Sequence, residues 1–236
     1  MAQTAQGTSA HPHEATLSRH HRYWISGGDL HFLVRRTRFR VHSYFFTRES
    51  SLWKGRIALS GDSSRQPGTH ETTAFVLDED PEDFARFLWV FYNPRYGICN
   101  ATLDQWITIL RLATTWEFPN IREFAISYIN ALAIETIDKV KIYQEYHVPR
   151  KYLLPLLLEL ATRDEPLERE EFRAIDVDSL YLIISAREML RTSRLANPAR
   201  RLSGEEKLDI VVSAFDITPL EIEALRDLGE DLPSCF

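Results

Sequence analysis

Two short segments near the start of the chain, 29–34 and 37–41, place an apolar residue at every second position. The residues that share one face in this way are Leu30, Phe32 and Val34 in the first segment, and Thr37, Phe39 and Val41 in the second. A period of two predicts strands that bury one face. Arg35-Arg36 between them predicts the turn of a hairpin, and segment 74–77 is predicted as a third strand.

From residue 42 onward, apolar residues recur at intervals of three and four, which predicts helices. A short helix is expected over 43–48, and Ser50 is expected to cap the element that follows. Asp80 and Pro81 are expected to open a helix that ends at Asn93. Further helices are predicted over 103–118, 120–133, 136–146, 150–163, 168–175 and 177–192, the last carrying Leu180, Ile183, Ile184, Arg187 and Leu190.

This order of elements predicts an α+β fold, in which a small mixed sheet is capped by a helical cluster and followed by an all-helical extension. The expected ranges are a disordered tail at 1–22, the mixed domain at 23–133, the helical extension at 134–194, and a linker with short C-terminal helices at 195–236. The last range carries two capping boxes, at 203–206 and 218–221. Segment 60–72 holds no apolar side chain and is expected to be a surface loop.

Metal and cofactor binding are not predicted. Cys99 and Cys235 are too far apart in sequence to indicate a disulfide framework or a zinc site, so a reducing compartment is expected. The tail has neither a scaffold nor a set of Cys or carboxylate partners, so a disordered tail is favoured over a metal site for its histidines. These histidines are His11, His13, His20 and His21.

Charge and hydropathy narrow the classes of partner. The 236 residues include 28 Lys and Arg against 34 Asp and Glu, a net charge of -6, which argues against nucleic acid. Arg36, Arg38 and Arg40 share one strand face, and a solvated face is favoured there over phosphate binding. No apolar run approaches the roughly 18 residues of a membrane span, and the N-terminus lacks the apolar core of a signal peptide. An intracellular protein, cytoplasmic or nuclear, with no membrane contact is expected.

Catalytic residues are not predicted either. The chain has no Gly-x-Ser-x-Gly turn, and its Ser26-Gly27-Gly28 segment lacks the Lys-Ser/Thr ending of a phosphate-binding loop. His42 stands next to Ser43 and near Glu49, and Asp29 is a further candidate neighbour, so an acid–base pair is one reading of these residues. A histidine that caps or bonds the start of the helix is favoured over that pair.

The chain resembles a BTB/POZ domain, most closely the variant common in large fungal families. In the first half of the match, the residues that carry the resemblance are Asp29, Phe39, His42, and Ser50-Ser51-Leu52-Trp53. Downstream they are Val76-Leu77, Pro81, Phe84, Phe87-Leu88, Tyr92, Ala113, Trp116, Phe118 and Pro119. The match covers about residues 23 to 133, and the helices beyond it resemble a short form of the BACK-like extension that often follows BTB domains.

Two features depart from the family pattern. Members that form strand-exchanged homodimers often carry a basic residue after the histidine, near a buried Asp, whereas this chain has Ser43 there. An unpaired buried carboxylate at Asp29 is costly, so its role as a dimer anchor is open. Members that bind cullin scaffolds use a compact, partly apolar segment where this chain has the polar 60–72 loop.

The resemblance implies a non-enzymatic protein–protein interaction module that forms homo- or heterodimers with BTB proteins. One of the aromatics Tyr44, Phe45 and Phe46 is expected to point outward, because consecutive helical residues splay around the axis. An alternative is a substrate adaptor for a cullin-type ubiquitin ligase; a further one, of another class, is an enzyme or small-ligand binder. The predicted interface residues are Tyr23, Trp24, Asp29, Leu30, His42, Ser43, Phe45 and Phe46.

Overall fold

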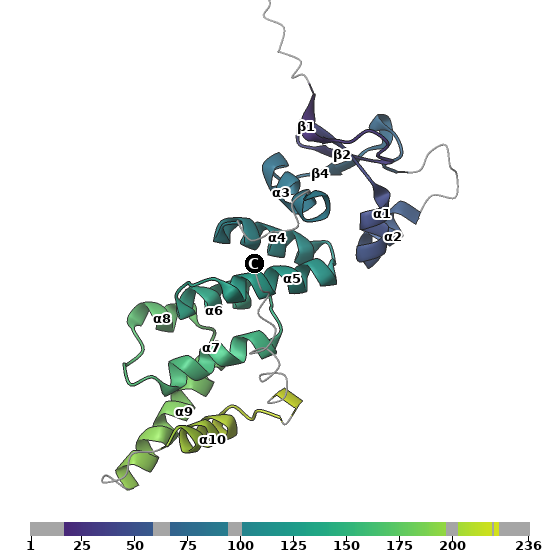
Figure 1. The fold of residues 1–236 in the computed structure, drawn as a ribbon. Coiled ribbons are helices and arrows are strands. Elements are labelled where there is room, and N and C mark those ends of the chain that lie inside the picture. The colour runs from purple at the N-terminus through teal and green to yellow at the C-terminus, as the bar shows by residue number, and fades with distance from the viewer. Residues whose placement is uncertain (1–16, 59–66, 94–100, 197–202, 219, 222–236) are drawn as a thin grey trace, which may run out of the picture. The chain divides into compact units, whose positions relative to one another are not determined.

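The computed structural model describes residues 17–58, 67–93, 101–196, 203–218 and 220–221 (Figure 1). The chain divides into two compact units, residues 1–92 and 93–236. The first unit is a small sheet with helices, and the described part of the second is helical. The coarse expectation of a mixed α+β chain with a small sheet is confirmed.

The sheet of the first unit has four strands in the order β1-β3-β2-β4. The predicted hairpin is present, because β2 and β3 pair antiparallel with Phe32 opposite Phe39. Arg35 in the turn has a positive φ of 51°. The outer strands β1 and β4 each run parallel to their neighbour. The strands are β1 Ser18–Trp24, β2 Leu30–Val34, β3 Thr37–Val41 and β4 Phe75–Leu77.

Three helices of this unit pack on one face of the sheet, around the ring of Phe32. That ring lies 5.1 Å from Phe46 of α1, 5.2 Å from Trp53 of α2 and 5.0 Å from Phe84 of α3, measured between ring centres. All four side chains are buried, as the alternation of β2 predicts. The helices are α1 Ser43–Glu49, α2 Ser51–Ala58 and α3 Pro81–Tyr92, with a 3-10 turn at Glu71–Thr73.

β1 corrects the expected start of order. The strand begins at Ser18, so the prediction of a disordered tail is wrong for residues 18–22; residues 1–16, which include His11 and His13, lie outside the described residues. The Ser18 N–H donates to the Arg36 carbonyl at 3.0 Å. His20 is buried and stacks on Phe39 with 4.7 Å between ring centres. A polar segment is ordered here because β3 supplies both the backbone partner and the apolar surface.

The 60–72 segment was predicted as a surface loop, but Gly68 within it packs against the sheet. Gly68 is buried, has a φ of 81°, and its carbonyl accepts the His31 N–H at 2.7 Å. Residues 67–72 therefore dock on the edge of β2 before β4 begins, while residues 59–66 lie outside the described residues.

The second unit follows the predicted order of helices. Ser203 forms the reciprocal capping box expected of it, and Thr102 forms one as well. Thr218 and Glu221 bond each other in the same pattern. No helix among the described residues is long and apolar enough to cross a membrane. The helices are α4 Leu103–Thr115, α5 Pro119–Ala131, α6 Thr136–Glu145, α7 Arg150–Thr162, α8 Arg169–Ala174, α9 Val177–Ala196 and α10 Gly204–Ala214.

The division between the units falls at Tyr92/Asn93, before α4 and α5. The sequence reasoning assigned these two helices to the first domain and placed a boundary after residue 133. The expected domain limits at 23–133, 134–194 and 195–236 stay predictions, since compactness alone does not test a family assignment.

Candidate protein-interaction surface

Asp29 and Ser43 are joined by two hydrogen bonds at the start of α1. The Ser43 N–H donates to Asp29 Oδ1 at 2.7 Å, and the Ser43 hydroxyl donates to Oδ2 at 2.6 Å. Partial desolvation acts to raise the pKa of Asp29, but the bonds from Ser43 and the nearby His42 outweigh it and hold the pKa below its ordinary value. The expectation of a buried Asp29 is wrong: the residue is exposed, and Ser43 supplies both donors.

His42 contacts the end of α3. Its side chain does not cap α1. Instead the backbone N–H of His42 donates to Tyr92 Oη at 2.9 Å, and the ring Nδ1 of His42 lies 3.1 Å from the same oxygen. Burial raises the pKa of Tyr92, so the phenol stays neutral. Because the Ser43 hydroxyl donates to Asp29 and His42 contacts Tyr92, the geometry does not form a Ser43–His42 acid–base pair.

The three consecutive aromatics of α1 point in different directions, as predicted. Phe46 is fully buried and packs on Phe32 of the core. Phe45 is half-buried and stacks on Phe91 of α3, with 5.0 Å between ring centres. Tyr44 is 57% exposed and is the outward member of the three.

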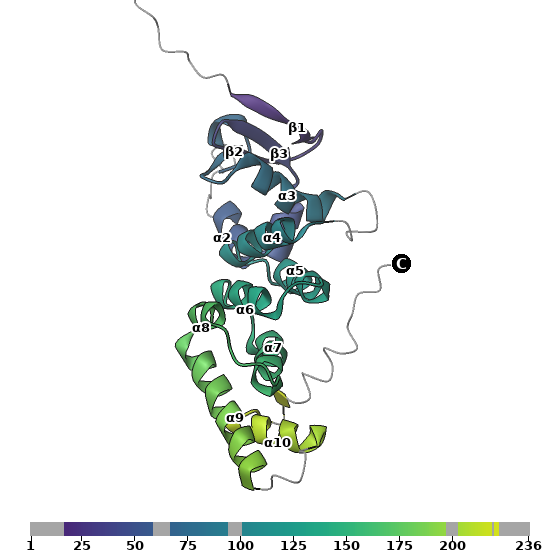
Figure 2. The ribbon, with the colours of Figure 1, turned by 90° about the vertical axis from the view of Figure 1, so that its left-hand side faces the viewer.

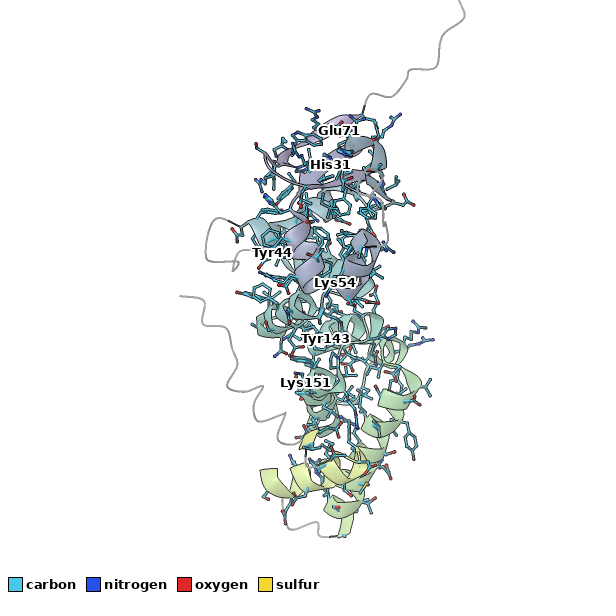
Figure 3. The ribbon with its side chains drawn as sticks, turned by 90° about the vertical axis from the view of Figure 1, so that its right-hand side faces the viewer. His31, Tyr44, Lys54, Glu71, Tyr143 and Lys151 are labelled. Atoms are coloured by element: carbon cyan, nitrogen blue, oxygen red, sulfur yellow. The ribbon has the colours of Figure 1, made fainter. Side chains whose placement is uncertain are left out.

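Arg48 holds the exposed Tyr44 ring in one orientation. Arg48 Nη1 donates to Tyr44 Oη at 2.9 Å, and Arg48 Cζ lies 4.8 Å from the centre of the ring. Figure 3 shows Tyr44 at the outside of the first unit. A ring that is already oriented loses less conformational freedom when a partner binds. Tyr44 and Arg48 are therefore preorganised to contact a partner protein.

Three predicted interface residues belong to the core instead. Tyr23, Leu30 and Phe46 are all buried, so none of them offers surface to a partner in this structure. Leu30 and Phe46 are buried because β2 and α1 turn these side chains toward the same apolar interior. The expectation that the first strand presents Leu30 outward is corrected.

Trp24 lies on the other face of the sheet. Its ring meets His31 edge-on at 5.7 Å, and Arg19 Cζ lies 4.3 Å from its centre. Arg19 and Arg38 both form ion pairs with Glu71, at 3.0 and 2.7 Å; His31 and Glu71 are labelled in Figure 3. Since His31 and the core residue Phe32 are adjacent on a strand, their side chains point to opposite faces. Trp24 is therefore separate from the residues around α1.

The start of α1 brings together a set of residues that we call the α1 surface. Sequence reasoning identified four of its members but did not single out Arg48, although the spacing of four from Tyr44 on a helix was a usable signal. It also missed Tyr92 as the support beneath this surface, because the partner of Tyr92 lies 50 residues earlier in sequence. The α1 surface consists of Asp29, His42, Ser43, Tyr44, Phe45 and Arg48.

The chemistry of the α1 surface suits contact with a protein. It offers two aromatic rings, one guanidinium group, and a carboxylate whose oxygens already accept hydrogen bonds. Within the described ranges, no group of three or more His, Cys, Asp or Glu side chains is placed to hold a metal ion. Cys99 and Cys235 lie outside those ranges.

No family model matches the chain, and no curated protein matches it.

Proposed function

We propose that this protein is a non-enzymatic interaction module of the BTB/POZ type, and that it joins a second chain through the α1 surface. The partner is a second copy or a related BTB protein. The resemblance in sequence supports the type of module, and the small mixed sheet agrees with the coarse fold class that the resemblance implies.

The observation that carries the proposal is the state of Tyr44. The ring is 57% exposed, yet Arg48 fixes it by a hydrogen bond and by stacking. Tyrosine and arginine are enriched among the residues that contribute most to protein–protein affinity. An exposed, oriented pair of these types, bordered by half-buried Phe45, is what a docking surface requires.

The experiment compares the association of the wild-type chain with that of Tyr44→Asp and Phe45→Asp. Light scattering after size-exclusion chromatography measures the mass in solution. Wild type is expected to self-associate at tens of micromolar, and both variants are expected to lower the associated fraction. Val76→Asp is the matched control, because Val76 is also an exposed apolar residue of the first unit but lies on β4.

Two outcomes contradict the proposal. The first is a wild-type chain that neither self-associates nor recovers a related BTB protein from its native cell. The second is association that Val76→Asp weakens while Tyr44→Asp leaves it unchanged, which would move the contact to the β4 edge. The adaptor role in a cullin-type ligase stays a prediction, because no separate contact among the described residues favours it. A pull-down from the native cell that recovers no cullin would rule this role out.

A further inference from the structure

α9 of the second unit carries two opposite stripes of side chains. The buried stripe consists of Ser179, Ile183, Ala186 and Leu190, and it faces the bundle, where α9 packs with α7 and α10. Figure 2 shows α7 and α10 on one side of α9 and no described element along the other. The exposed stripe along that other side consists of Val177, Tyr181, Ile184, Glu188, Arg191 and Leu195.

The apolar members of the exposed stripe are widely accessible. Val177 is 82% exposed, Tyr181 70%, Ile184 44% and Leu195 69%. Single exposed apolar residues are ordinary on a protein surface, but contiguous ones indicate a contact site. The sequence pattern places Ile184 on the same apolar face as Ile183, which is buried. The structure separates them because adjacent residues of a helix lie about 100° apart around its axis.

The spacing of the exposed stripe is that of a helix–helix seam. Its six positions follow one another at intervals of 4, 3, 4, 3 and 4 residues. This alternation of four and three is the pattern that keeps one face of a helix against a partner helix. The buried stripe has the same spacing and already has its partners. The exposed stripe extends for about 27 Å along α9, so its complement is another helix.

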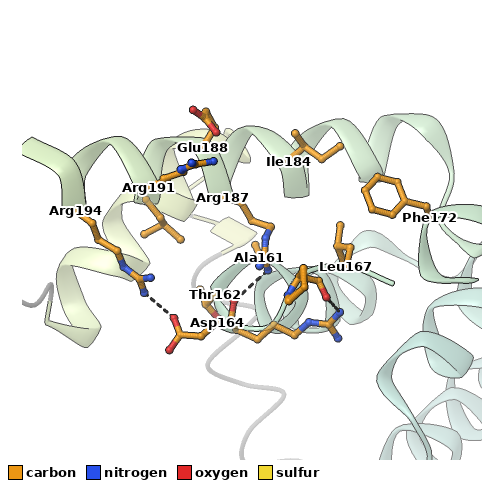
Figure 4. A pocket seen from close by; sticks show the side chains of 13 residues that line it. Ala161, Thr162, Asp164, Leu167, Phe172, Ile184, Arg187, Glu188, Arg191 and Arg194 are labelled. Carbon is orange, nitrogen blue, oxygen red and sulfur yellow. Dashed lines mark hydrogen bonds and ion pairs between the residues drawn. The ribbon is translucent and has the colours of Figure 1, made fainter. Parts of the chain in front are cut away.

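A groove that Ile184, Glu188 and Arg191 of the stripe help to line does not explain the exposure of the stripe. A pocket of about 420 Å³ lies between α9 and the turn after α7 (Figure 4). Three of its arginines are engaged within the chain: Arg187 donates to the Leu160 carbonyl at 2.8 Å, Arg194 pairs with Asp164 at 2.8 Å, and Arg163 pairs with Glu171. In the part of the chain that the structure describes, the side chains of Glu188 and Arg191 have neither a hydrogen bond nor an ion pair.

We propose that the exposed stripe of α9 is an interface for a second copy of this chain, in which the two α9 helices run antiparallel. The charges in the stripe select this arrangement. A parallel pair would set Glu188 against Glu188 and Arg191 against Arg191, whereas an antiparallel pair sets Glu188 of each chain against Arg191 of the other. Two-fold symmetry makes both ion pairs at once, and it brings Ile184 of each chain against Leu195 of the other. In this register the paired part of the stripe runs from Ile184 to Leu195, and Val177 and Tyr181 extend past the end of the partner's α9 at Ala196.

This interface is independent of the α1 surface, since it lies on the other unit. α9 is already folded against α7 and α10. Pairing therefore does not have to offset the loss of conformational entropy that forming a helix costs. Pairing through one helix face alone buries less than a standard interface, so weak association at about 10 to 100 µM is expected.

A charge-exchange experiment on the full-length chain tests the pairing. Glu188→Arg makes both charges of the stripe positive, and Arg191→Glu makes both negative. Each variant alone is expected to raise the dissociation constant about tenfold, which is 1.4 kcal/mol, and an equimolar mixture of the two is expected to recover the affinity. Sedimentation equilibrium measures this. Any contact between the two side chains within one helix is the same in pure and mixed samples, so failure of the mixture to associate better than either variant overturns the proposal.

A second comparison separates this interface from the α1 surface. Ile184→Asp is expected to abolish pairing through α9, whereas Met189→Asp is expected to leave it unchanged, because Met189 is 42% exposed but lies off the stripe. Ile184→Asp and Met189→Asp are each also made in a chain that carries Tyr44→Asp. If both interfaces exist, only the chain with Tyr44→Asp and Ile184→Asp together is monomeric. If Ile184→Asp has no effect in either background, the α9 interface is absent, whatever Tyr44→Asp does.

Discussion

The carboxylate of Asp29 accepts both the backbone N–H and the hydroxyl of Ser43, at 2.7 and 2.6 Å. The two residues are 14 positions apart, and their contact ties the loop before β2 to the first turn of α1. The first turn of α1 has no acidic residue of its own. Asp29 therefore supplies from outside the helix the negative charge that a helix N-terminus favours.

Removal of the Ser43 hydroxyl is expected to destabilise the first unit. Ser43→Ala leaves one oxygen of Asp29 without its donor and is expected to lower the free energy of unfolding by about 1 kcal/mol. Urea unfolding measures the change. Ser43→Thr keeps a hydroxyl and is the control, expected close to wild type. Equal destabilisation by Ala and Thr would show that the hydroxyl contributes nothing.

The Asp29 contact is also expected to make stability depend on pH. The pKa of Asp29 in the folded chain lies below its ordinary value of 3.8, so its contribution is present above that value and is lost as the pH falls through the lower, folded pKa. The gap in free energy of unfolding between wild type and Asp29→Asn is therefore expected to narrow below pH 3.8. A gap that stays constant down to acid pH would mean that the carboxylate is not the acceptor.

Tyr92 is expected to support the α1 surface through its hydroxyl. Tyr92→Phe leaves the His42 N–H without its acceptor at 2.9 Å and is expected to lower the free energy of unfolding by about 1 to 2 kcal/mol. Amide hydrogen exchange over residues 43–49 should rise with it. Tyr44→Phe is the control, since its hydroxyl is exposed and an effect within about 0.5 kcal/mol is expected. Similar effects of the two changes would argue against a special role of Tyr92.

Gly68 and Gly27 form a matched pair that tests how residues 67–72 dock on the sheet. Both have a φ of 81°, but a Cβ at Gly68 would lie 2.6 Å from the Phe75 ring, whereas one at Gly27 meets nothing within 4 Å. Gly27→Ala is expected to destabilise by about 1 kcal/mol from backbone strain alone, and Gly68→Ala by about 2 to 4 kcal/mol. Thermal unfolding orders the two variants, and the reverse order would contradict the docked position of Gly68.

Tyr143 and Tyr152 are expected to respond oppositely to the same change. The buried Tyr143 hydroxyl has no hydrogen-bond partner among the described residues, and burial raises the pKa of Tyr143. Tyr143→Phe is expected to stabilise the second unit by about 1 kcal/mol. Tyr152 donates to Glu123, so Tyr152→Phe is expected to destabilise it by about the same amount. Chemical denaturation of both variants checks the signs; a loss of stability in Tyr143→Phe would reveal a partner for that hydroxyl.

Local patterns predicted most of the elements. The β2–β3 hairpin, the cap at Ser50 and the capping box at Ser203 were all predicted from residues within a few positions of one another. The α1 surface was predicted less well. Asp29, His42, Ser43 and Phe45 do come together, but Leu30 and Phe46 are buried, and Tyr92 was missed.

The amino-acid sequence by itself determined where strands and helices form, because periodicity, caps and turns act over a few residues. Only the tertiary structure decided the rest: that polar β1 is ordered beside β3, that Tyr44 faces outward, and that one stripe of α9 is buried while the opposite one is exposed. Both stripes of α9 have the same spacing. Which of them is covered depends on the elements that pack against the helix, and contacts between distant segments leave no local signal in the chain.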